Sequence, residues 1–327
     1  MTLTLALNNI NYLQEQENFI NDELLKAYEM QLDVSENTKR TYINCLKKFI
    51  TWLEDNNINN VEYETILSYK SYLKSHEEYN EETLEIMQVE HKARAINTHL
   101  TAIKDFFKYL ERKGFRNVAK GVKKERTNNN FSKDSLTLEQ VKGIYESIDI
   151  NTIEGARANA LFRLLIGTGL RECEVIRADI QDIGTKADKN VLYVQGKGEK
   201  EKNNYVIITP SVMQALQHYF KMRGNPKPSE PLFISNSDRN NGQRLTTRTI
   251  QRIVKGLYAN NGIISNKITT HSTRHTAITL SVLNGASIQQ AQSMARHKDI
   301  NTTMIYFHNI NRLEDNAESK LEQLLND

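Results

Sequence analysis

Apolar side chains recur at three- and four-residue steps through much of this chain, and the repeat is interrupted between Ala119 and Asp134. A repeat of that period places one apolar stripe along each of a series of helices, and the helices must pack together to remove the stripe from water. Four prolines and fourteen glycines in 327 residues leave few points at which helices would break. Because single hydrophobic cores stop growing beyond about 250 residues, the length and the interruption together predict two domains, mainly α-helical.

The first part carries four amphipathic segments, at residues 18–30, 35–54, 62–74 and 91–113. Ser35 is a typical N-cap for the second of them, because its hydroxyl can accept a hydrogen bond from a backbone N–H of the first turn. Gly114 is typical of a helix end. Four amphipathic helices with short connections predict a small helical bundle. We place this domain at residues 35–118, after an N-terminal extension over residues 1–34 that contains the first of the four segments.

The interval between the two parts is basic. Between residues 120 and 133 five Lys or Arg residues face one Glu, so the segment carries 5 − 1 = +4. Such a segment is either a solvated linker or a linker that also lies along a phosphate backbone. We take residues 119–135 as a basic linker, with Lys123 and Lys124 as candidate DNA contacts. The net charge of +3 for the whole chain is too small to indicate a polyanionic partner by itself.

The second part combines helical patterns with one short β-hairpin. A Thr-x-x-Gln capping box begins its first helix at Thr137. Two β-branched runs, residues 191–194 and 205–208, flank a polar interval and predict a hairpin with a polar tip. Helical patterns occur at residues 138–147, 156–167, 211–222, 247–258, 275–284, 288–295 and 302–307. We expect one domain over residues 136–312 and a final amphipathic helix over residues 313–327.

Residues with recognisable chemistry occur in five places of the second part. In chain order they are Arg171 in Gly-Thr-Gly-Leu-Arg-Glu-Cys-Glu, Lys197 on the predicted hairpin, His271 and Arg274 in His-Ser-Thr-Arg-His-Thr, His297 in Ala-Arg-His-Lys, and Tyr306 in Met-Ile-Tyr-Phe-His. A single Arg or Tyr would indicate nothing, since a surface salt bridge or a buried aromatic ring explains it. The ordered set is specific, and it resembles the tyrosine recombinase (phage integrase) family.

The resemblance covers residues 136–310 and, more weakly, residues 35–115, which are similar to the helical, SAM-like core-binding domain of that family. It implies a core-binding domain followed by an α/β catalytic domain. It also implies a site-specific recombinase that cleaves and rejoins double-stranded DNA through a 3′-phosphotyrosyl intermediate, for integration and excision or resolution of a mobile element or replicon. Because the phosphotyrosyl ester stores the energy of the broken bond, no ATP, metal or other cofactor is expected.

The resemblance also implies a role for each residue of the set. Arg171 and Arg274 match the clamp on the non-bridging phosphate oxygens, where two guanidinium groups neutralise charge that grows in the transition state. Tyr306 matches the nucleophile, although a phenol with a reference pKa of about 10 must be positioned and deprotonated before it attacks. Lys197 matches the general acid that protonates the leaving 5′-oxygen.

Three further residues have supporting roles by the same resemblance. His271 bonds the phosphate and assists proton transfer, His297 donates a second hydrogen bond to it, and Glu174 supports the site. The family carries Gly directly before the histidine that His297 matches, whereas this chain has Arg296. Gly permits backbone conformations that Arg resists, so the local turn is expected to differ, or Arg296 to add a phosphate contact. His275 is interpreted as structural.

Two of these assignments have rivals in the sequence. Lys200 and Lys202 share the loop of Lys197, and either of them could reach the phosphate instead. Tyr258 is the alternative to Tyr306, but it lacks the flanking pattern.

Several basic residues are candidate contacts to the DNA backbone. They are Lys39, Arg40, Lys47, Lys123, Lys124, Arg244, Arg248 and Arg252. The last three are spaced four apart, which would place them in a row on a predicted helix. For any one residue in the first domain, an ordinary solvated charge is an equally good explanation.

The final segment, Leu313–Leu325, has an apolar stripe and acidic flanks, so it is not expected to lie on DNA. The resemblance implies that it docks on a neighbouring protomer, with four protomers on two DNA sites. The alternative is a helix folded back on its own domain. No apolar run reaches the ~18 residues of a membrane span, no signal peptide opens the chain, and the two cysteines have no metal-ligand spacing. We expect a cytoplasmic protein with no membrane partner and no metal site.

Two other functions fit parts of the pattern. A nicking and closing enzyme of the type IB topoisomerase kind would share the active site without pairing two DNA sites. A non-catalytic DNA-binding regulator would carry the same residues without using them.

Overall fold

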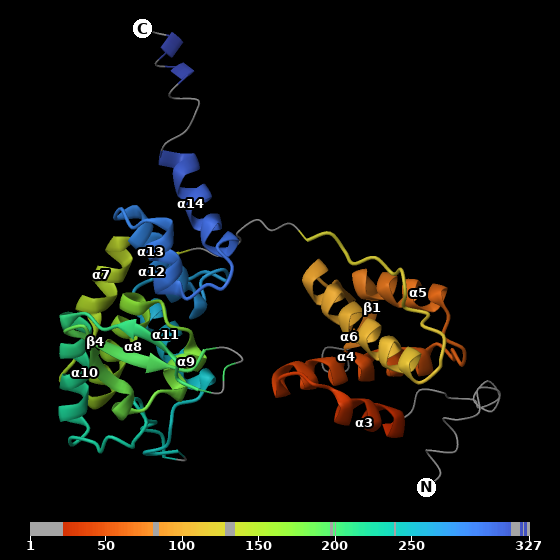
Figure 1. The fold of residues 1–327 in the computed structure, drawn as a ribbon, viewed down its shortest axis with the longest axis horizontal. Coiled ribbons are helices and arrows are strands. Elements are labelled where there is room, and N and C mark those ends of the chain that lie inside the picture. The colour runs from red at the N-terminus through yellow and green to blue at the C-terminus, as the bar shows by residue number, and fades with distance from the viewer. Residues whose placement is uncertain are drawn as a thin grey trace. The chain divides into compact units, whose positions relative to one another are not determined.

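The computed structural model describes residues 22–80, 85–127, 135–196, 199, 201–238, 240–314, 321–322 and 324–325. The chain forms two compact units, Met1–Asn129 and Asn130–Asp327 (Figure 1). Helices make up most of both units, and each unit has one small antiparallel sheet. This architecture confirms the predicted fold class. In the described part of the chain, no helix has the length and apolarity that a membrane crossing requires.

The first unit is a helical bundle. Its helices are α3 (Asp22–Gln31), α4 (Glu36–Asp55), α5 (Tyr63–Lys74) and α6 (Ala93–Arg112). Ser35 caps α4 as predicted, with its hydroxyl accepting a hydrogen bond from the Thr38 backbone N–H. Phe49 from α4, Ile66 from α5 and Leu100 from α6 are fully buried and meet in one core.

Helix α3 belongs to this bundle, although it lies inside the predicted N-terminal extension of residues 1–34. Leu25 and Tyr28 are 3% and 1% exposed in the shared core. The Tyr28 hydroxyl donates a 2.7 Å hydrogen bond to Asp105 on α6. A boundary at residue 35 would therefore separate a packed helix from its core.

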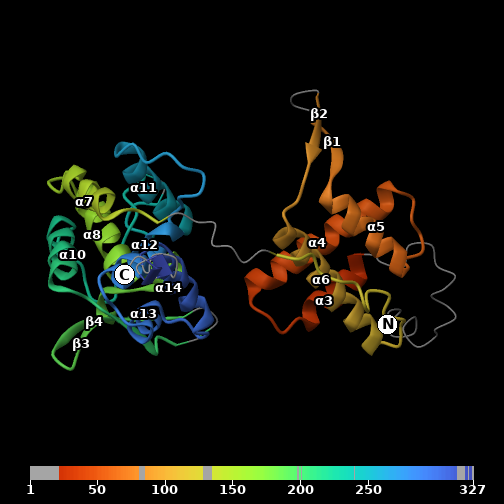
Figure 2. The same ribbon diagram turned by 90° about the horizontal axis from the view of Figure 1, so that it is seen from above.

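A β-hairpin in the first unit was not predicted. Strands β1 (His76–Asn80) and β2 (Glu85–Val89) pair antiparallel, from His76↔Val89 to Asn80↔Glu85. The hairpin projects from the helices (Figure 2). Ile86 and Met87 are 68% and 49% exposed. Because neither face of the hairpin packs on a core, its sequence lacks the alternation of apolar and polar residues that identifies a half-buried strand.

The first residues of the basic interval still pack against the first unit. Val122 is 1% exposed in the bundle core. The Asn97 side chain on α6 bonds the backbone of Glu125 twice, donating to its carbonyl at 2.9 Å and accepting from its N–H at 2.7 Å. The Lys70 ammonium on α5 pairs with the Glu125 carboxylate at 2.7 Å. A free linker can therefore start only after Glu125.

The second unit is built around one buried helix and a three-stranded sheet. Its helices are α7 (Leu138–Ser147), α8 (Ile153–Thr168), α9 (Glu172–Arg177), η1 (Ile180–Asp182), α10 (Pro210–Met222), α11 (Thr247–Asn260), α12 (His271–Leu283), α13 (Ile288–Ala295) and α14 (Asn301–Glu314). Helix α8 packs against both α10 and α12. Its Leu161, Phe162 and Leu164 are fully buried.

The sheet has the order β3 (Ile183–Lys186), β4 (Lys189–Val194), β5 (Asn204–Ile207), all antiparallel. Strands β4 and β5 confirm the predicted hairpin, with Val191 opposite Ile207 and Val194 opposite Asn204. Strand β3 was not predicted, because four residues with one large apolar side chain, Ile183, carry too little pattern. The polar interval between β4 and β5 contains residues 197, 198 and 200, which lie outside the described residues.

Helices α12, α13 and α14 form a separate apolar cluster. Its buried members are Ile278 and Val282 from α12, Ala291 and Ala295 from α13, and Tyr306 from α14. Helix α14 runs through the predicted boundary between the catalytic domain and the final helix at residues 312 and 313. Most of that predicted final helix lies outside the described residues.

Candidate active site

One pocket of about 1420 Å³ in the second unit collects most of the predicted catalytic residues. Arg171, Glu174, His271, Arg274, His297 and Tyr306 all line it. They come from four regions of the chain, the start of α9, helix α12, the turn after α13 and helix α14. Lys197 lies outside the described residues, so its position is not part of this geometry. Among the described residues, no group of three or more His, Cys, Asp or Glu side chains is arranged to hold a metal ion.

Arg171 enters the pocket at a sharp turn between two helices. Gly169 ends α8 in the left-handed conformation, with φ 61° and ψ 24°, which glycine adopts without a Cβ clash. Arg171 then caps α9. Its backbone N–H and its Nη1 donate to the Glu174 carboxylate at 2.7 Å and 3.1 Å. The Arg171 side chain is 29% exposed and Glu174 only 1%, so the guanidinium reaches the pocket while its partner lies beneath it.

Arg274 is buried, with 2% of its surface exposed. Its Nη1 donates to the Gly169 carbonyl at 2.6 Å, and its Nη2 donates to the Ala295 carbonyl. Burial, together with the nearby charges of Arg171 and Arg296, lowers the pKa of Arg274 to about 10. The guanidinium therefore stays a cation at neutral pH, held rigidly between α8 and α13.

Arg296 keeps the turn that a Gly would make. Its backbone is left-handed, with φ 53° and ψ 46°, directly after α13. Its Nη2 donates to Glu174 at 2.7 Å and its Nη1 to the Met294 carbonyl at 3.0 Å. The expectation of a different turn is wrong, because these contacts hold Arg in the strained conformation. The side chain is 11% exposed and bound to Glu174, an arrangement that does not favour the alternative of a phosphate contact.

His297 lies against the ring of Tyr306. The two rings are stacked, with centroids 6.4 Å apart and an interplanar angle of 22°. The Nδ1 of His297 is 2.8 Å from the Thr303 hydroxyl. Burial lowers the pKa of His297 to about 4, and the charges of Arg274 and Arg171 add to the effect. The imidazole is therefore neutral at physiological pH, and with Thr303 donating to Nδ1 its Nε2 can donate to a phosphate.

Tyr306 is 5% exposed on α14, and its hydroxyl contacts Nδ1 of His275. Burial raises the pKa of Tyr306 to about 12, against the lowering effect of Arg274 and Arg171. The phenol is therefore neutral at pH 7. Tyr306 lines the same pocket as Arg171 and Arg274.

His275, interpreted from the sequence as structural, also lines the pocket. It is 8% exposed on α12 and its ring lies 5.7 Å from the Tyr306 ring, between centroids. His271 stands edge-on to His275, with centroids 4.8 Å apart and an angle of 85°. The spacing of four residues between the two histidines already placed them on one helix face. That signal could have marked His275 as a pocket residue.

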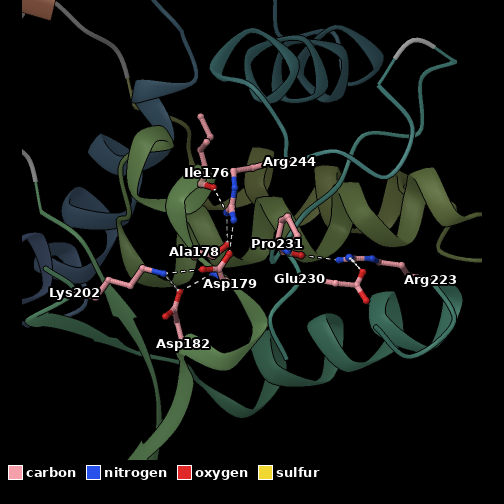
Figure 3. A network of polar contacts seen from close by, with 9 residues as sticks. All are labelled: Ile176, Ala178, Asp179, Asp182, Lys202, Arg223, Glu230, Pro231 and Arg244. Carbon is pink, nitrogen blue, oxygen red and sulfur yellow. Dashed lines mark hydrogen bonds and ion pairs between the residues drawn. The ribbon is translucent and has the colours of Figure 1, made fainter. Parts of the chain in front are cut away.

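Lys202 is engaged in a structural network at the end of the predicted hairpin (Figure 3). Its Nζ pairs with Asp179 at 3.0 Å and with Asp182 at 2.5 Å. Burial lowers the pKa of Lys202, but the hydrogen bonds of Asp182 and Asp179 outweigh burial and raise it. A lysine held in this way is poorly suited to give up a proton. The other two candidates for the general acid in this loop, Lys197 and Lys200, lie outside the described residues.

Arg244 belongs to the same network and does not lie in a row with Arg248 and Arg252. It precedes α11, which begins at Thr247. Its Nη1 donates to the carbonyls of Ile176 at 2.7 Å and Ala178 at 2.9 Å, and its Nη2 pairs with Asp179 (Figure 3). The expected row on one helix is therefore wrong for Arg244, because its guanidinium is bonded within the protein.

The other candidate DNA contacts differ in how accessible they are. Arg40, Lys47, Lys123, Lys124, Arg248 and Arg252 are exposed. Arg248 and Arg252 line a second pocket of about 770 Å³ in the second unit, together with Lys255. Lys39 is half-buried and pairs with Glu36 at 3.1 Å, which weakens it as a candidate.

Comparisons with known proteins cover both units of the chain. The sequence profile of the Phage integrase family matches residues 134–312, and the profile of the Phage integrase, N-terminal SAM-like domain matches residues 22–114. Tyrosine recombinase XerC of Chlamydia caviae is 31% identical over 229 residues, 69% of this chain and 70% of that protein. Tyrosine recombinase XerD of Staphylococcus epidermidis is 26% identical over 300 residues, 89% of this chain and 94% of that protein.

Two solved structures share the fold at lower sequence identity. XerH site-specific recombinase bound to difH substrate, in a pre-cleavage complex, has a TM-score of 0.65 and 19% identity, covering 90% of this chain and 83% of that one. A lambda integrase dimer bound to a COC′ core site has a TM-score of 0.62 and 17% identity, covering 86% of this chain and 96% of that one.

Proposed function

The chain belongs to the phage integrase family of tyrosine recombinases and is a site-specific DNA recombinase, and we propose that Tyr306 attacks the scissile DNA phosphate. The supporting observation is that Tyr306, Arg171 and Arg274 line one pocket of the second unit. In-line attack by the phenol oxygen forms a 3′-phosphotyrosyl bond and releases a 5′-hydroxyl. Reversal of the same step by the 5′-hydroxyl of another strand rejoins the DNA, with no outside energy source.

The phosphate clamp consists of Arg171 and Arg274. Negative charge grows on the non-bridging oxygens during attack, and fixed donors aimed at that charge stabilise the transition state more than the substrate. Arg274 is fixed by two backbone carbonyls and Arg171 by Glu174. Glu174 is therefore a positioning residue. His271 and His297 are assigned the remaining hydrogen bonds to the phosphate.

Lys197 is the proposed general acid. An alkoxide is a poor leaving group, so a proton delivered to the 5′-oxygen speeds the departure of that strand. The assignment follows the position of Lys197 in Gly-Lys-Gly after the first strand of the predicted hairpin. The engagement of Lys202 with Asp179 and Asp182 supports it by removing one rival.

Double-stranded DNA is the proposed partner of both units. Arg40, Lys47, Lys123 and Lys124 of the first unit and Arg248 and Arg252 of the second are exposed cations that fit phosphate contacts. Binding should weaken steeply with salt, because each phosphate contact releases counterions. The XerH and lambda integrase neighbours were both solved on their own DNA substrates.

The proposed assembly is a homotetramer that holds two DNA sites. Leu321, Leu324 and Leu325 are 55%, 75% and 74% exposed, and apolar side chains gathered on a short segment favour burial against a partner. A second copy of this chain is the proposed partner of that segment. We place the reaction in the cytoplasm and assign it to integration and excision or resolution of a mobile element or replicon.

A covalent capture experiment tests the assignment without knowledge of the DNA site. The library consists of short duplexes that have a randomised central sequence and one nick within it. When the nicked strand is cleaved, the short fragment that carries the 5′-hydroxyl dissociates, so the strand cannot be rejoined. SDS-resistant adducts are collected and sequenced, and one enriched duplex, called the capture duplex below, is resynthesised. Wild-type protein should form the adduct and Tyr306→Phe should bind the capture duplex without forming it. Equal adduct formation by both proteins, or none by the wild type across the library, would overturn the proposal.

A further inference from the structure

The hydrogen bond between Nδ1 of His275 and the Tyr306 hydroxyl has a chemical consequence for the attack step. We propose that His275 is the proton acceptor for Tyr306, taking the phenol proton as the oxygen bonds to phosphorus. The inference rests on the proposed role of Tyr306 and adds a residue that the resemblance leaves structural. His275 touches a reacting atom directly, so it is a catalytic residue in this scheme.

The contact is held by packed structure. His275 and Tyr306 are 8% and 5% exposed. They lie on α12 and α14, which share the cluster of Ile278, Val282 and Ala295. A buried side-chain pair on two packed helices keeps its geometry when substrate enters, which is the requirement for a catalytic hydrogen bond. With Nε2 protonated and Nδ1 bare, the phenol donates and the imidazole accepts.

A base is needed because the phenol is neutral at working pH. Burial raises the pKa of Tyr306 to about 12, so about one phenol in ten thousand is ionised at pH 8. A neutral phenol is a weak nucleophile, and the standard remedy is an adjacent base in hydrogen-bond contact. His275 occupies that position.

The other ionisable side chains around the phenol have other proposed roles. His271 on α12 stands edge-on to His275, His297 after α13 stacks on the Tyr306 ring, and the charges of Arg274 and Arg171 act on the Tyr306 hydroxyl. The arginines are cations at neutral pH and accept no proton. His297 is a weak base, since burial lowers its pKa to about 4 and the arginine charges add to that effect. Its Nδ1 is also occupied by Thr303.

The proton balance closes within the site. As the Tyr306 oxygen bonds to phosphorus, its proton moves to Nδ1 of His275, which becomes an imidazolium. The bond from phosphorus to the 5′-oxygen breaks, and that oxygen takes a proton from the general acid assigned to Lys197. During rejoining the 5′-hydroxyl attacks phosphorus and gives its proton back to the amine assigned to Lys197. The bond from phosphorus to the phenol oxygen breaks, and His275 returns its proton to that oxygen. No oxidant, reductant or cofactor takes part in either direction.

Two substitutions separate proton acceptance from mere positioning. His275→Asn places an amide near the position of Nδ1, so it can keep a hydrogen bond to the phenol but cannot take its proton. His275→Ala removes both functions. Single-turnover cleavage of the capture duplex should fall at least about 10²-fold in both variants. Added imidazole should restore part of the rate of His275→Ala.

The pH profile supplies a readout that a structural role would not change. Wild-type cleavage should level off as pH rises, because a base in contact with the phenol takes its proton without hydroxide. Cleavage by His275→Asn should keep rising about tenfold per pH unit between about pH 6.5 and 9, since hydroxide must then ionise the phenol. Circular dichroism of each variant checks that the chain is folded.

A modified substrate separates this base from the general acid. Sulfur in place of the bridging 5′-oxygen of the capture duplex leaves without a proton, so it should restore Lys197→Ala and leave the defect of His275→Asn in place. A folded His275→Asn with the wild-type rate and a level profile would overturn the inference. If Tyr306→Phe still formed the adduct, the proposed function would fail instead, whatever His275 does.

Discussion

Arg296 and Glu174 form a buried ion pair, in which Nη2 of Arg296 donates to Oε2 of Glu174 at 2.7 Å and the side chains are 11% and 1% exposed. The same carboxylate accepts Nη1 of Arg171 at 3.1 Å. Glu174 therefore joins the turn before His297 to the phosphate clamp. The pair also accounts for a non-Gly residue with positive φ at position 296, since it offsets strain of about 1 kcal/mol.

Glu174→Ala should lower the free energy of unfolding by about 3 kcal/mol, because it leaves two largely buried guanidinium groups without their carboxylate. Urea denaturation of the full chain measures the loss. Glu172→Ala is the matched control. It removes a neighbouring, half-buried carboxylate that accepts a 2.9 Å hydrogen bond from the neutral Gln251 amide, and it should cost about 1 kcal/mol. Equal losses in the two variants would contradict the bridging role of Glu174.

Arg274→Lys should slow cleavage of the capture duplex at least about 10²-fold. An ammonium group keeps the charge but cannot bond two separate carbonyls and still present a planar fork to the phosphate. Arg177→Lys, on the exposed end of α9, is the control and should stay within about twofold of wild type. A rate for Arg274→Lys close to that of the control would remove Arg274 from the clamp.

The predicted residues that line the pocket could be found in the sequence because each lies in a short motif, and the order of the motifs carries the information. Arg244 could not be placed in that way. Its carbonyl partners, Ile176 and Ala178, lie 68 and 66 residues earlier in the chain, and a spacing of four residues to Arg248 gave a misleading helical row. Only the fold brings the end of α9 against the segment before α11.

The fold class followed from apolar periodicity, and the errors occur where that signal is weak. The β1–β2 hairpin buries neither face, so no alternation identifies it. His275 shared a helix face with His271 in the sequence, but the residue it contacts depends on how α12 packs against α14. Periodicity reports which side of a helix is buried and does not report which partner covers it.

The stability of the second unit should depend on pH through Asp179. Burial by itself raises the pKa of Asp179, but the hydrogen bonds of Arg244 and Lys202 outweigh burial and hold it below its ordinary range. A lowered pKa means that the folded state binds this proton more weakly than the unfolded state does. The stabilisation is therefore fully present above about pH 4, which is the pKa of Asp in the unfolded chain. It is lost as the pH falls through the lower pKa of Asp179 in the folded state.

Urea denaturation of wild type and Asp179→Asn from pH 7 to pH 3 measures this contribution. The wild type should be the more stable protein at pH 7, and the difference should shrink as Asp179 becomes protonated. A difference that stays constant or grows toward low pH would show that Asp179 does not act through its charge.

Arg248 and Arg252 should contribute to DNA affinity through charge alone. The double variant Arg248→Ala/Arg252→Ala should reduce the slope of log K against log salt by about 2, since each phosphate contact contributes about 0.9. Fluorescence anisotropy with the capture duplex at several salt concentrations measures the slope. Arg244→Ala should instead destabilise the fold, because its guanidinium bonds two carbonyls and Asp179. An unchanged slope in the double variant would place this face of α11 away from DNA.

Identification of the residue bonded to DNA tests directly whether Tyr306 is the nucleophile. The SDS-resistant adduct of wild-type protein with the capture duplex is digested with nuclease and protease, and the modified peptide is sequenced by mass spectrometry. We predict a 3′-phosphate ester on Tyr306. A phosphate ester on any other residue, Tyr258 included, would contradict it.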